Sequence, residues 1–430
     1  MKLSQTSFPR IFMVTIFSFL KTAAFAVIFL FISFIPVSSQ AQKKTQKQQT
    51  AIEVIEDTTR KVDLIDIVKS QFQFSPKTIK RSEGKKIYFS LLPVSSAIPG
   101  GGKALITTTS AGFYLGSRRN TFISNVSFSP YLNFKGRYSL NFRSNIFTSY
   151  NRWNILGDTR FSLYPEYTWG TKTNDRQNEK VLVNYKYIRL YQTLLRRIKP
   201  YLLAGMGYDF DYHININTLN DTIGLTKFTG YNYGTGAGKN SLSSGLTFNI
   251  LYDTRKNSVN PLPGNYANLI YRVNPRFLGN GSNTWTSLYL DGRKYISFPD
   301  RKRKILALWS YVWTALDNNV PYLDLPGIGW DSYQKSGRGI QQNRYRGKTL
   351  WYGEGEYRRD LTINGLLGYV VFANYNFITG PGDNHYSGPH PAIGAGLRLK
   401  FNKRSNTNIA IDYGISKGNS GIYFNLGEAF

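Results

Sequence analysis

Several residue types are absent or scarce in this chain of 430 residues. It contains no cysteine and only 3 histidines. The absence of cysteine excludes a disulfide scaffold, a thiolate metal site and a cysteine nucleophile. It also suits export through an oxidising compartment, where stray thiols would mispair. Long apolar runs are missing after Val37, because no later stretch approaches the length of a membrane-spanning helix. Any membrane location of the later chain must therefore come from strands.

Acidic residues are also scarce. The chain has 25 Asp and Glu against 54 Lys and Arg, which gives a formal net charge of +29. A balance of this kind can indicate nucleic-acid binding. Here the basic residues are scattered through tyrosine-rich alternating segments, without a recognition motif or a basic helix. We therefore expect no nucleic-acid partner, and we attribute the charge to anionic lipid headgroups or to a cationic lumen.

Aromatic residues are abundant, in contrast to these shortages. The chain has 31 tyrosines and 28 phenylalanines, and 15% of its residues are aromatic. The mean hydropathy is nevertheless only −0.33. Soluble enzymes rarely carry so many rings, and helical membrane proteins are far more apolar. A transmembrane β-barrel reconciles both values, because alternate residues face lipid and a polar lumen while aromatic girdles mark the two interfaces.

The N-terminus has the pattern of an export signal. Residues 1–41 begin with the basic Lys2 and Arg10, continue through the apolar stretch Ala23–Val37 and end in small residues that suit cleavage. An uncleaved membrane anchor is the alternative, since the stretch just before this one is apolar too. Cleavage is favoured because nothing downstream resembles a stop-transfer segment or a soluble catalytic domain.

The next segment, residues 42–84, starts polar and basic and then becomes weakly amphipathic. Two interpretations stay open for this short periplasmic segment. It forms either a short periplasmic or plug helix, or a mostly disordered linker.

Residues 85–430 alternate between polar and apolar side chains and are punctuated by turn clusters. In 201–212, for example, Leu202, Met206 and Tyr208 share one face while Asp211 lies on the other. Charged residues cannot face lipid cheaply, so the polar face must be the lumen. The pattern predicts an all-β, 16-stranded antiparallel transmembrane β-barrel with its strands near 85–94, 103–116, 120–132, 136–149, 159–169, 184–195, 199–212, 240–252, 264–275, 283–296, 302–315, 346–359, 366–378, 391–402, 406–416 and 421–430.

The connections between these runs differ in length. The clusters 260–264 and 299–300 are compact and rich in proline, glycine or aspartate, as periplasmic turns should be. The links 215–239 and 317–345 are long and irregular, and we expect them to be outer loops or a lumen insertion.

The final run closes on an aromatic residue. Alternation places Ile422, Phe424, Leu426, Glu428 and Phe430 on one side of the last strand. Assembly machinery binds an unpaired, aromatic-ended edge strand by strand addition. We therefore expect Phe424, Leu426 and Phe430 to form a C-terminal assembly signal.

Four motifs stand out in the C-terminal half. They are Asp253-Thr254-Arg255-Lys256-Asn257 followed by Pro261 and Gly264, Arg338-Gly339-Ile340 followed by Asn343-Arg344-Tyr345-Arg346, Gly353-Glu354-Gly355-Glu356-Tyr357-Arg358, and Ile411-Asp412-Tyr413-Gly414 with Phe424-Asn425-Leu426-Gly427-Glu428-Ala429-Phe430. With these motifs the C-terminal half resembles the BamA/TamA (bacterial surface antigen) family of outer-membrane proteins. The match covers about residues 250–430.

The resemblance implies a 16-stranded barrel with a thin seam between the first strand and the last. It also implies that the loop carrying Arg338 and Gly339 folds into the lumen, where Arg338 meets the wall residue Glu356. The expectation is physically sound, because a guanidinium inside a narrow barrel needs a carboxylate partner and its fork geometry positions a loop well. The alternative for Arg338 is a solvated loop arginine.

Three departures from the family pattern are visible. The aromatic position of the loop motif is Ile340 here, and the wall segment 372–374 has Asn374 where the family usually has an acid, so a second acidic partner is expected to be missing. Residues 42–84 are too few for a periplasmic POTRA module. Client capture is then expected to come from a partner, or the protein does something else.

No enzyme site is expected. His385, His390 and Asp383 lie in a Gly/Pro-rich stretch, but their spacing matches no metal motif. No nucleophilic serine with a matching histidine and acid is evident, and the glycine-rich run 234–238 lacks a phosphate-loop ending. We therefore expect no catalytic residues, no metal and no cofactor, and a lipid-modifying enzyme is only the third hypothesis.

The first hypothesis is a barrel in the cell outer membrane that assists assembly, insertion or translocation of outer-membrane or surface components. Its expected partners are outer-membrane lipid and outer-membrane or periplasmic proteins. The second hypothesis is a passive channel or structural barrel without a machinery role.

Overall fold

The computed structural model describes residues 61–71, 87–98, 102–117, 120–133, 137–163, 165–171, 179–219, 223–255, 257, 260–261, 263–279, 284–300, 302–383, 385–403 and 406–430. The expected signal sequence, residues 1–41, lies outside the described residues. So does most of the expected periplasmic segment 42–84.

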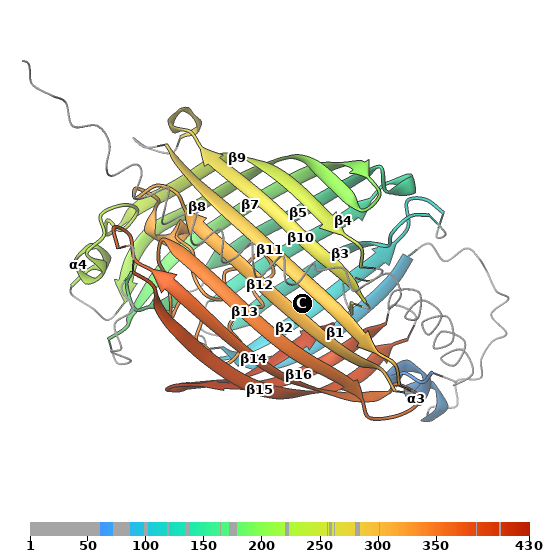
Figure 1. Ribbon diagram of the computed structural model, residues 1–430. Coiled ribbons are helices and arrows are strands. Elements are labelled where there is room, and N and C mark those ends of the chain that lie inside the picture. The colour runs from blue at the N-terminus through green and yellow to red at the C-terminus, as the bar shows by residue number, and fades with distance from the viewer. Residues whose placement is uncertain are drawn as a thin grey trace, which may run out of the picture. The chain divides into compact units, whose positions relative to one another are not determined.

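Nearly all of the described chain forms one antiparallel sheet, whose slanted strands follow one another in sequence order (Figure 1). The strands are β1 Ile87–Ile98, β2 Gly102–Phe113, β3 Ser124–Asn133, β4 Tyr138–Phe147, β5 Trp153–Leu163, β6 Glu166–Thr168, β7 Val181–Lys199, β8 Leu202–Leu219, β9 Lys239–Asp253, β10 Gly264–Asn274, β11 Trp285–Phe298, β12 Lys304–Ala315, β13 Thr349–Asp360, β14 Leu367–Thr379, β15 Ser387–Asn402, β16 Thr407–Ser416 and β17 Asn419–Leu426.

Each strand pairs with its neighbours in the sequence, with one exception. β6 pairs with β7 beyond the end of β5, which also pairs with β7, so β5 and β6 share one place in the sheet. The 17 strands therefore occupy sixteen places. The expected number of strands is confirmed. The expected strand 159–169 begins too late in the sequence, since β5 begins at Trp153.

The side chains show why these segments form a barrel wall. In the neighbouring strands β15 and β16, Arg398 and Asp412 are buried, whereas Leu397 is 63% exposed and Tyr413 50% exposed. β8 behaves in the same way, with Asp211 buried and Met206 exposed. This is the inverse of a soluble sheet. It is the arrangement expected when the outer face meets lipid and the inner face meets a polar lumen.

Few helices are present in the described part of the chain. They are α3 Leu64–Gln71, α4 Leu225–Thr229 and the short 3-10 turns η1 Ser149–Asn151, η2 Arg276–Leu278 and η3 Tyr322–Asp324. Among the described residues, no helix has the length and apolar content needed to cross a bilayer.

The helix α3 packs at the turn between β15 and β16. The backbone N–H of Lys403 in that turn donates to Oδ2 of the buried Asp63 (2.8 Å), and its Nζ donates to Asp66 Oδ2 (2.6 Å). The residues just after position 60 are therefore attached to the same end of the sheet as the turns after β13 and β15.

The two connections expected to be long differ in outcome. β8 continues to Leu219, so the expected irregular link 215–239 is too long by several residues at its start. The residues after β12, 316–348, form a loop whose apolar side chains, including Ile328 and Ile340, are buried together with inward-facing wall residues. Of the two expectations for this link, an outer loop or a lumen insertion, the structure shows the insertion.

The end of the chain departs from the expected alternation. β17 stops at Leu426, and Gly427 has φ 98°, a left-handed conformation that suits glycine and ends the strand. Phe424 is 39% exposed on the outer face, whereas Phe430 is 4% exposed inside. The expectation that Phe424 and Phe430 lie on one face is therefore wrong, because the turn at Gly427 redirects the last three residues into the lumen.

Candidate functional site

The loop 316–348, called the lumen loop below, is the main feature inside the barrel. It folds back on itself through hydrogen bonds from Ile328 N to Tyr345 O (2.9 Å) and from Asn343 N to Ile328 O (3.1 Å). Two glycines, Gly337 and Gly339, have φ values of 78° and 93° and make the tight turn that presents the side chain between them. That side chain is Arg338.

Arg338 is surrounded by carboxylates of the barrel wall. Its Nη1 donates to Asp412 Oδ2 on β16 (2.6 Å), and its Nη2 donates to Glu356 Oε2 (3.1 Å) and to Glu354 on β13. The Arg338 side chain is 3% exposed, and the three carboxylate side chains are 0% exposed. The guanidinium also lies over the Phe372 ring at 3.7 Å from its centroid. A buried cation with this many ionised neighbours holds a loop strongly in place.

The carboxylates belong to a larger cluster that reaches the end of the chain. Arg398 donates through Nε to Glu428 Oε2 (2.7 Å) and pairs with Glu356 (3.3 Å) and Asp412. Arg358 pairs with Glu356 at 3.2 Å. Three arginines and four carboxylates, all buried, thus form one group, which we call the acid cluster: Arg338, Arg358, Arg398, Glu354, Glu356, Asp412 and Glu428.

The loop backbone touches the wall beside this cluster. A Cβ atom at Gly339 would lie 2.8 Å from the backbone nitrogen of Ile415, and one at Gly414 would lie 2.7 Å from the nitrogen of Gly339. The Tyr423 hydroxyl of β17 accepts from Gly339 N (2.8 Å), and Asn374 Nδ2 donates to Arg338 O (2.9 Å). Glycine is therefore required on both sides of this approach.

A second anchor holds the other end of the lumen loop. Arg346 Nη1 donates to the carbonyl oxygens of Tyr322, Leu323 and Leu325 (3.1, 2.8 and 3.2 Å), which ties the loop to itself. Asn343 donates to Glu166 on β6, a carboxylate that also accepts from the Tyr185 hydroxyl (2.6 Å). The lumen loop is thus fastened to β6–β7 as well as to β13 and β16.

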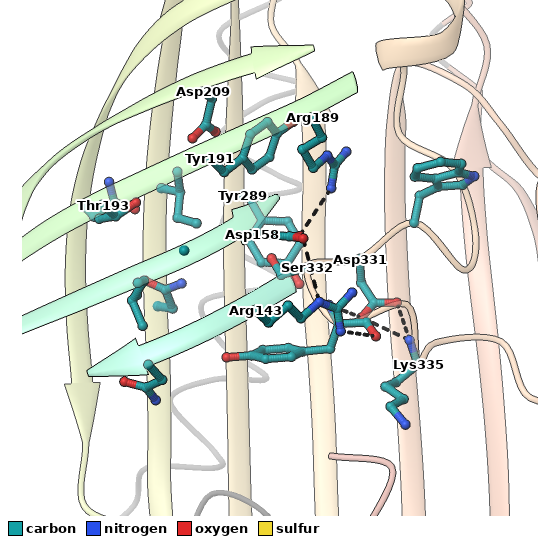
Figure 2. A pocket seen from close by; sticks show the side chains of 18 of the residues that line it. Arg143, Asp158, Arg189, Tyr191, Thr193, Asp209, Tyr289, Asp331, Ser332 and Lys335 are labelled. Atoms are coloured by element: carbon teal, nitrogen blue, oxygen red, sulfur yellow. Dashed lines mark hydrogen bonds and ion pairs between the residues drawn. The ribbon is translucent and has the colours of Figure 1, made fainter. Parts of the chain in front are cut away.

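A cavity of about 370 Å³ lies between the loop and the wall strands β3–β5 and β7–β12. Figure 2 shows that charged side chains from opposite sides face it, among them Arg143, Asp158 and Arg189 of the wall. Arg143 Nη1 donates to the loop carbonyl of Tyr333 (3.1 Å), and Arg189 Nη1 lies 3.7 Å from Asp158. Burial, together with the nearby Arg143 guanidinium, lowers the pKa of the loop residue Lys335 to about 8.

The C-terminal residue occupies an aromatic site beside the acid cluster. The Phe430 ring lies 5.1 Å from the Trp309 ring and 6.2 Å from the Tyr295 ring, measured between centroids. Arg358 Nη2 donates to Phe430 O (2.9 Å), and its guanidinium lies 5.2 Å from the Phe430 ring centroid. Leu426, the remaining residue of the expected assembly signal, borders the cavity.

The histidines do not gather. His385 is 97% exposed in its side chain and contacts Asp383, whereas His390 stacks on the Tyr345 ring at 3.8 Å. His213 is buried against Tyr187. Over the described ranges, no group of three or more His, Cys, Asp or Glu residues could hold a metal ion.

Comparison with solved structures finds proteins of similar architecture. BamA from Haemophilus ducreyi lacking POTRA domains 1–3 matches 79% of this chain and 68% of its own, with 12% identity and a TM-score of 0.50. CdiB from Acinetobacter baumannii matches 80% of this chain and 60% of its own, with 15% identity and a TM-score of 0.52. CdiB from Escherichia coli matches 79% and 62%, with 13% identity and a TM-score of 0.53.

The chain has the barrel fold of BamA and CdiB. No family model and no curated protein matches its sequence. The likeness confirms the expected BamA-type β-barrel fold. The chain spans about two thirds of the BamA chain and about three fifths of each CdiB chain.

The structure brings together two of the residues expected in the site, Arg338 and Glu356, and Gly339 lies beside them. Sequence analysis missed Glu354 and Asp412 as further partners. The expected lack of a second acidic partner is wrong, because β14 indeed offers Asn374 but β16 supplies a carboxylate instead. A signal was available, since Glu354 and Glu356 are two residues apart on one strand and must share a face.

Proposed function

We propose that this barrel acts in the outer membrane and assists assembly, insertion or translocation of outer-membrane or surface components through a weak seam. The observation that carries the proposal is the junction of β1 and β17. β1 pairs with β2 along its whole length and β17 pairs with β16, yet among the described residues no hydrogen-bonded register joins β1 to β17, although the backbones of the two strands lie next to each other. An unpaired edge is a template for another strand, and barrels normally remove it by closure.

The lumen loop supports this function because it braces the last strand from inside. Asn419 Nδ2 donates to Gly339 O (2.8 Å), Lys335 donates to Asn425, and the Tyr423 hydroxyl contacts the same turn. Three residues of β17 therefore rest on the loop that Arg338 anchors. The lumen loop thus holds β17 through side chains that point into the lumen, which leaves the backbone edge of β17 at the seam available.

The partners proposed are outer-membrane lipid and proteins of the outer membrane or periplasm. The exposed apolar residues of the outer face, such as Leu397 and Ile422, fit a lipid environment. The chain would receive its clients through a protein partner.

Covalent closure of the seam tests the proposal. The chain has no cysteine, so cysteines at successive positions of 91–96 in β1 can be combined with Ile422→Cys in β17. Oxidation of a pair that forms a disulfide should abolish assembly or export of surface proteins in cells, and reduction should restore it. The matched control is Tyr413→Cys with Ile422→Cys, two directly paired positions of β16 and β17. Normal function with a closed seam would refute the proposal.

A passive channel is the second candidate, and the charged cavity of about 370 Å³ is the observation in its favour. Conductance across a planar bilayer distinguishes the two functions. A steady open pore would support the channel, whereas a mostly silent barrel, with its path blocked by the lumen loop, would support the seam mechanism.

A further inference from the structure

Four basic side chains gather at the end of the sheet where the turns after β4 and β7 lie. They are Arg152 in the turn before β5, and Arg196, Arg197 and Lys199 at the end of β7. β5 and β7 are paired so that Trp153 lies directly opposite Arg196, and the backbone N–H of Arg197 donates to Arg152 O (2.9 Å). The four basic residues, called the basic rim below, therefore form one patch on neighbouring elements.

No carboxylate in the described part of the chain neutralises the basic rim. All four side chains are exposed, and none of them forms an ion pair with a described Asp or Glu. The segments 148–153 and 194–203 contain no acidic residue at all. The turn after β11, at the same end of the sheet, is built differently, because Arg303 there pairs with Asp360 (3.2 Å). Uncompensated cations this close repel one another, so the basic rim favours an anionic ligand.

The outer face of the wall beside the basic rim is apolar. Ile155, Leu194 and Met206 are directly paired on neighbouring strands and are 37%, 47% and 51% exposed. Arg196 follows Leu194 by two residues on β7, so both side chains point to the outer face and their Cα atoms lie about 7 Å apart. Arg196 therefore stands where the lipid-facing band of the wall gives way to the polar headgroup layer.

Aromatic side chains mark the same level. Trp153 is 39% exposed, and the Arg196 guanidinium lies 5.7 Å from its ring centroid. Tyr150 is 51% exposed with the Arg152 guanidinium 5.8 Å from its ring centroid, and Tyr201 is 48% exposed in the turn after β7. Trp and Tyr collect at the headgroup level of a bilayer, and long basic side chains extend from there to the phosphates. The basic rim thus presents its cations at the depth of lipid phosphates.

We propose that the basic rim is a binding site for the headgroup of an anionic phospholipid in the leaflet that surrounds this end of the barrel. The ligand must carry a net negative charge, because a zwitterionic headgroup holds its own ammonium beside the phosphate. The guanidinium and ammonium donors contact the phosphate oxygens, and the acyl chains lie along Ile155, Leu194 and Met206. The inference goes beyond the proposed function and does not depend on the seam, since neither β5 nor β7 neighbours β1 or β17 in the sheet.

Retention of lipid by the folded chain tests the proposal. The full chain is refolded in detergent, its folded state is checked by heat-dependent gel mobility, and phosphatidylglycerol and phosphatidylcholine with identical acyl chains are added together. Native mass spectrometry then counts the lipids that stay bound. The wild type should prefer phosphatidylglycerol at least about tenfold. Arg196→Gln with Lys199→Gln should lower this preference about tenfold, and so should Arg152→Gln with Arg197→Gln, because each pair removes two cations at the membrane surface.

The matched control is Lys302→Gln with Lys304→Gln, between β11 and β12, which removes the same formal charge at the same end of the sheet. Lys304 pairs there with Asp300 (2.5 Å) and Lys302 donates to Leu361 O (2.6 Å), so the control should keep the wild-type preference. Equal retention of the two lipids by the wild type, an unchanged preference in both rim variants, or the same loss in the control would overturn the proposal. Displacement of phosphatidylglycerol by inorganic phosphate at constant ionic strength would overturn it as well, because the rim would then bind a free anion.

Discussion

Replacement of Arg338 by alanine is the sharpest test of the lumen-loop anchor. The substitution leaves Arg358 and Arg398 to balance four carboxylates in the acid cluster, all with side chains that are 0% exposed. Solvent compensates poorly for the lost charge, since all residues of the cluster are buried. Removal of one partner from a buried ion-pair network costs about 3–5 kcal/mol of unfolding free energy.

The structure also predicts which part of the lumen loop should detach when Arg338 is removed. The loop would leave the wall near Gly339 but remain attached at its other end, because the bonds of Arg346 and Asn343 do not involve Arg338. Arg338→Ala should therefore lower the urea midpoint of the folded barrel and raise its conductance above that of the wild type. Arg338→Lys, which keeps the charge but not the fork, should fall between wild type and alanine.

The measurements are urea unfolding in lipid vesicles, followed by gel mobility, and single-channel recording. Arg143→Ala is the matched control. Arg143 also contacts the lumen loop, through Tyr333 O, but its side chain is 25% exposed and its carboxylate partner Asp158 retains Arg160. Its loss should cost only about 1 kcal/mol. If Arg338→Ala unfolds at the wild-type urea concentration and conducts no more than the wild type, the anchor has no structural role and the reasoning fails.

Two further substitutions probe how the lumen loop is held against the barrel wall. Gly339→Ala should lower the free energy of unfolding by about 1–3 kcal/mol, because the alanine would have to adopt the left-handed backbone conformation of Gly339. Its Cβ should also push the loop away from Ile415. Added protease should then cleave the loop faster than in the wild type, and unchanged cleavage would contradict this prediction. Glu166→Gln keeps the shape of the second anchor but replaces one of its two acceptor oxygens by an NH₂ group, and it should cost about 1–2 kcal/mol because either the Tyr185 or the Asn343 bond loses its acceptor. Its urea midpoint should fall less than that of Arg338→Ala, and an equal or larger fall would mean that the loop depends mainly on β6.

Much of the barrel wall was predictable because strand alternation is a local property. Leu397 and Arg398 are neighbours in sequence, and lipid on one side with a polar lumen on the other forces them to opposite faces wherever the strand lies. The sixteen places in the sheet follow from the same repeat. The bounds of β5 and β6 were harder to predict, since the break between these strands depends on their common neighbour β7.

The site was only partly predictable. The resemblance of the Arg338 motif to a known family suggested Glu356, but Asp412 is 74 residues from Arg338 in sequence and meets it only because β16 lies opposite the loop. The fate of Phe430 was missed for a related reason. Alternation continues formally through Glu428, and only the left-handed turn at Gly427 shows that the chain leaves the strand.

The sequence by itself determined which residues face lipid and which face the lumen, because polarity with a period of two leaves one arrangement that a membrane tolerates. The tertiary structure alone decided which charges meet inside, where the loop rests, and that the last residue turns inward. These contacts join strands far apart in the chain, and the free energy of a buried ion pair depends on distances of a few ångströms that no local pattern encodes.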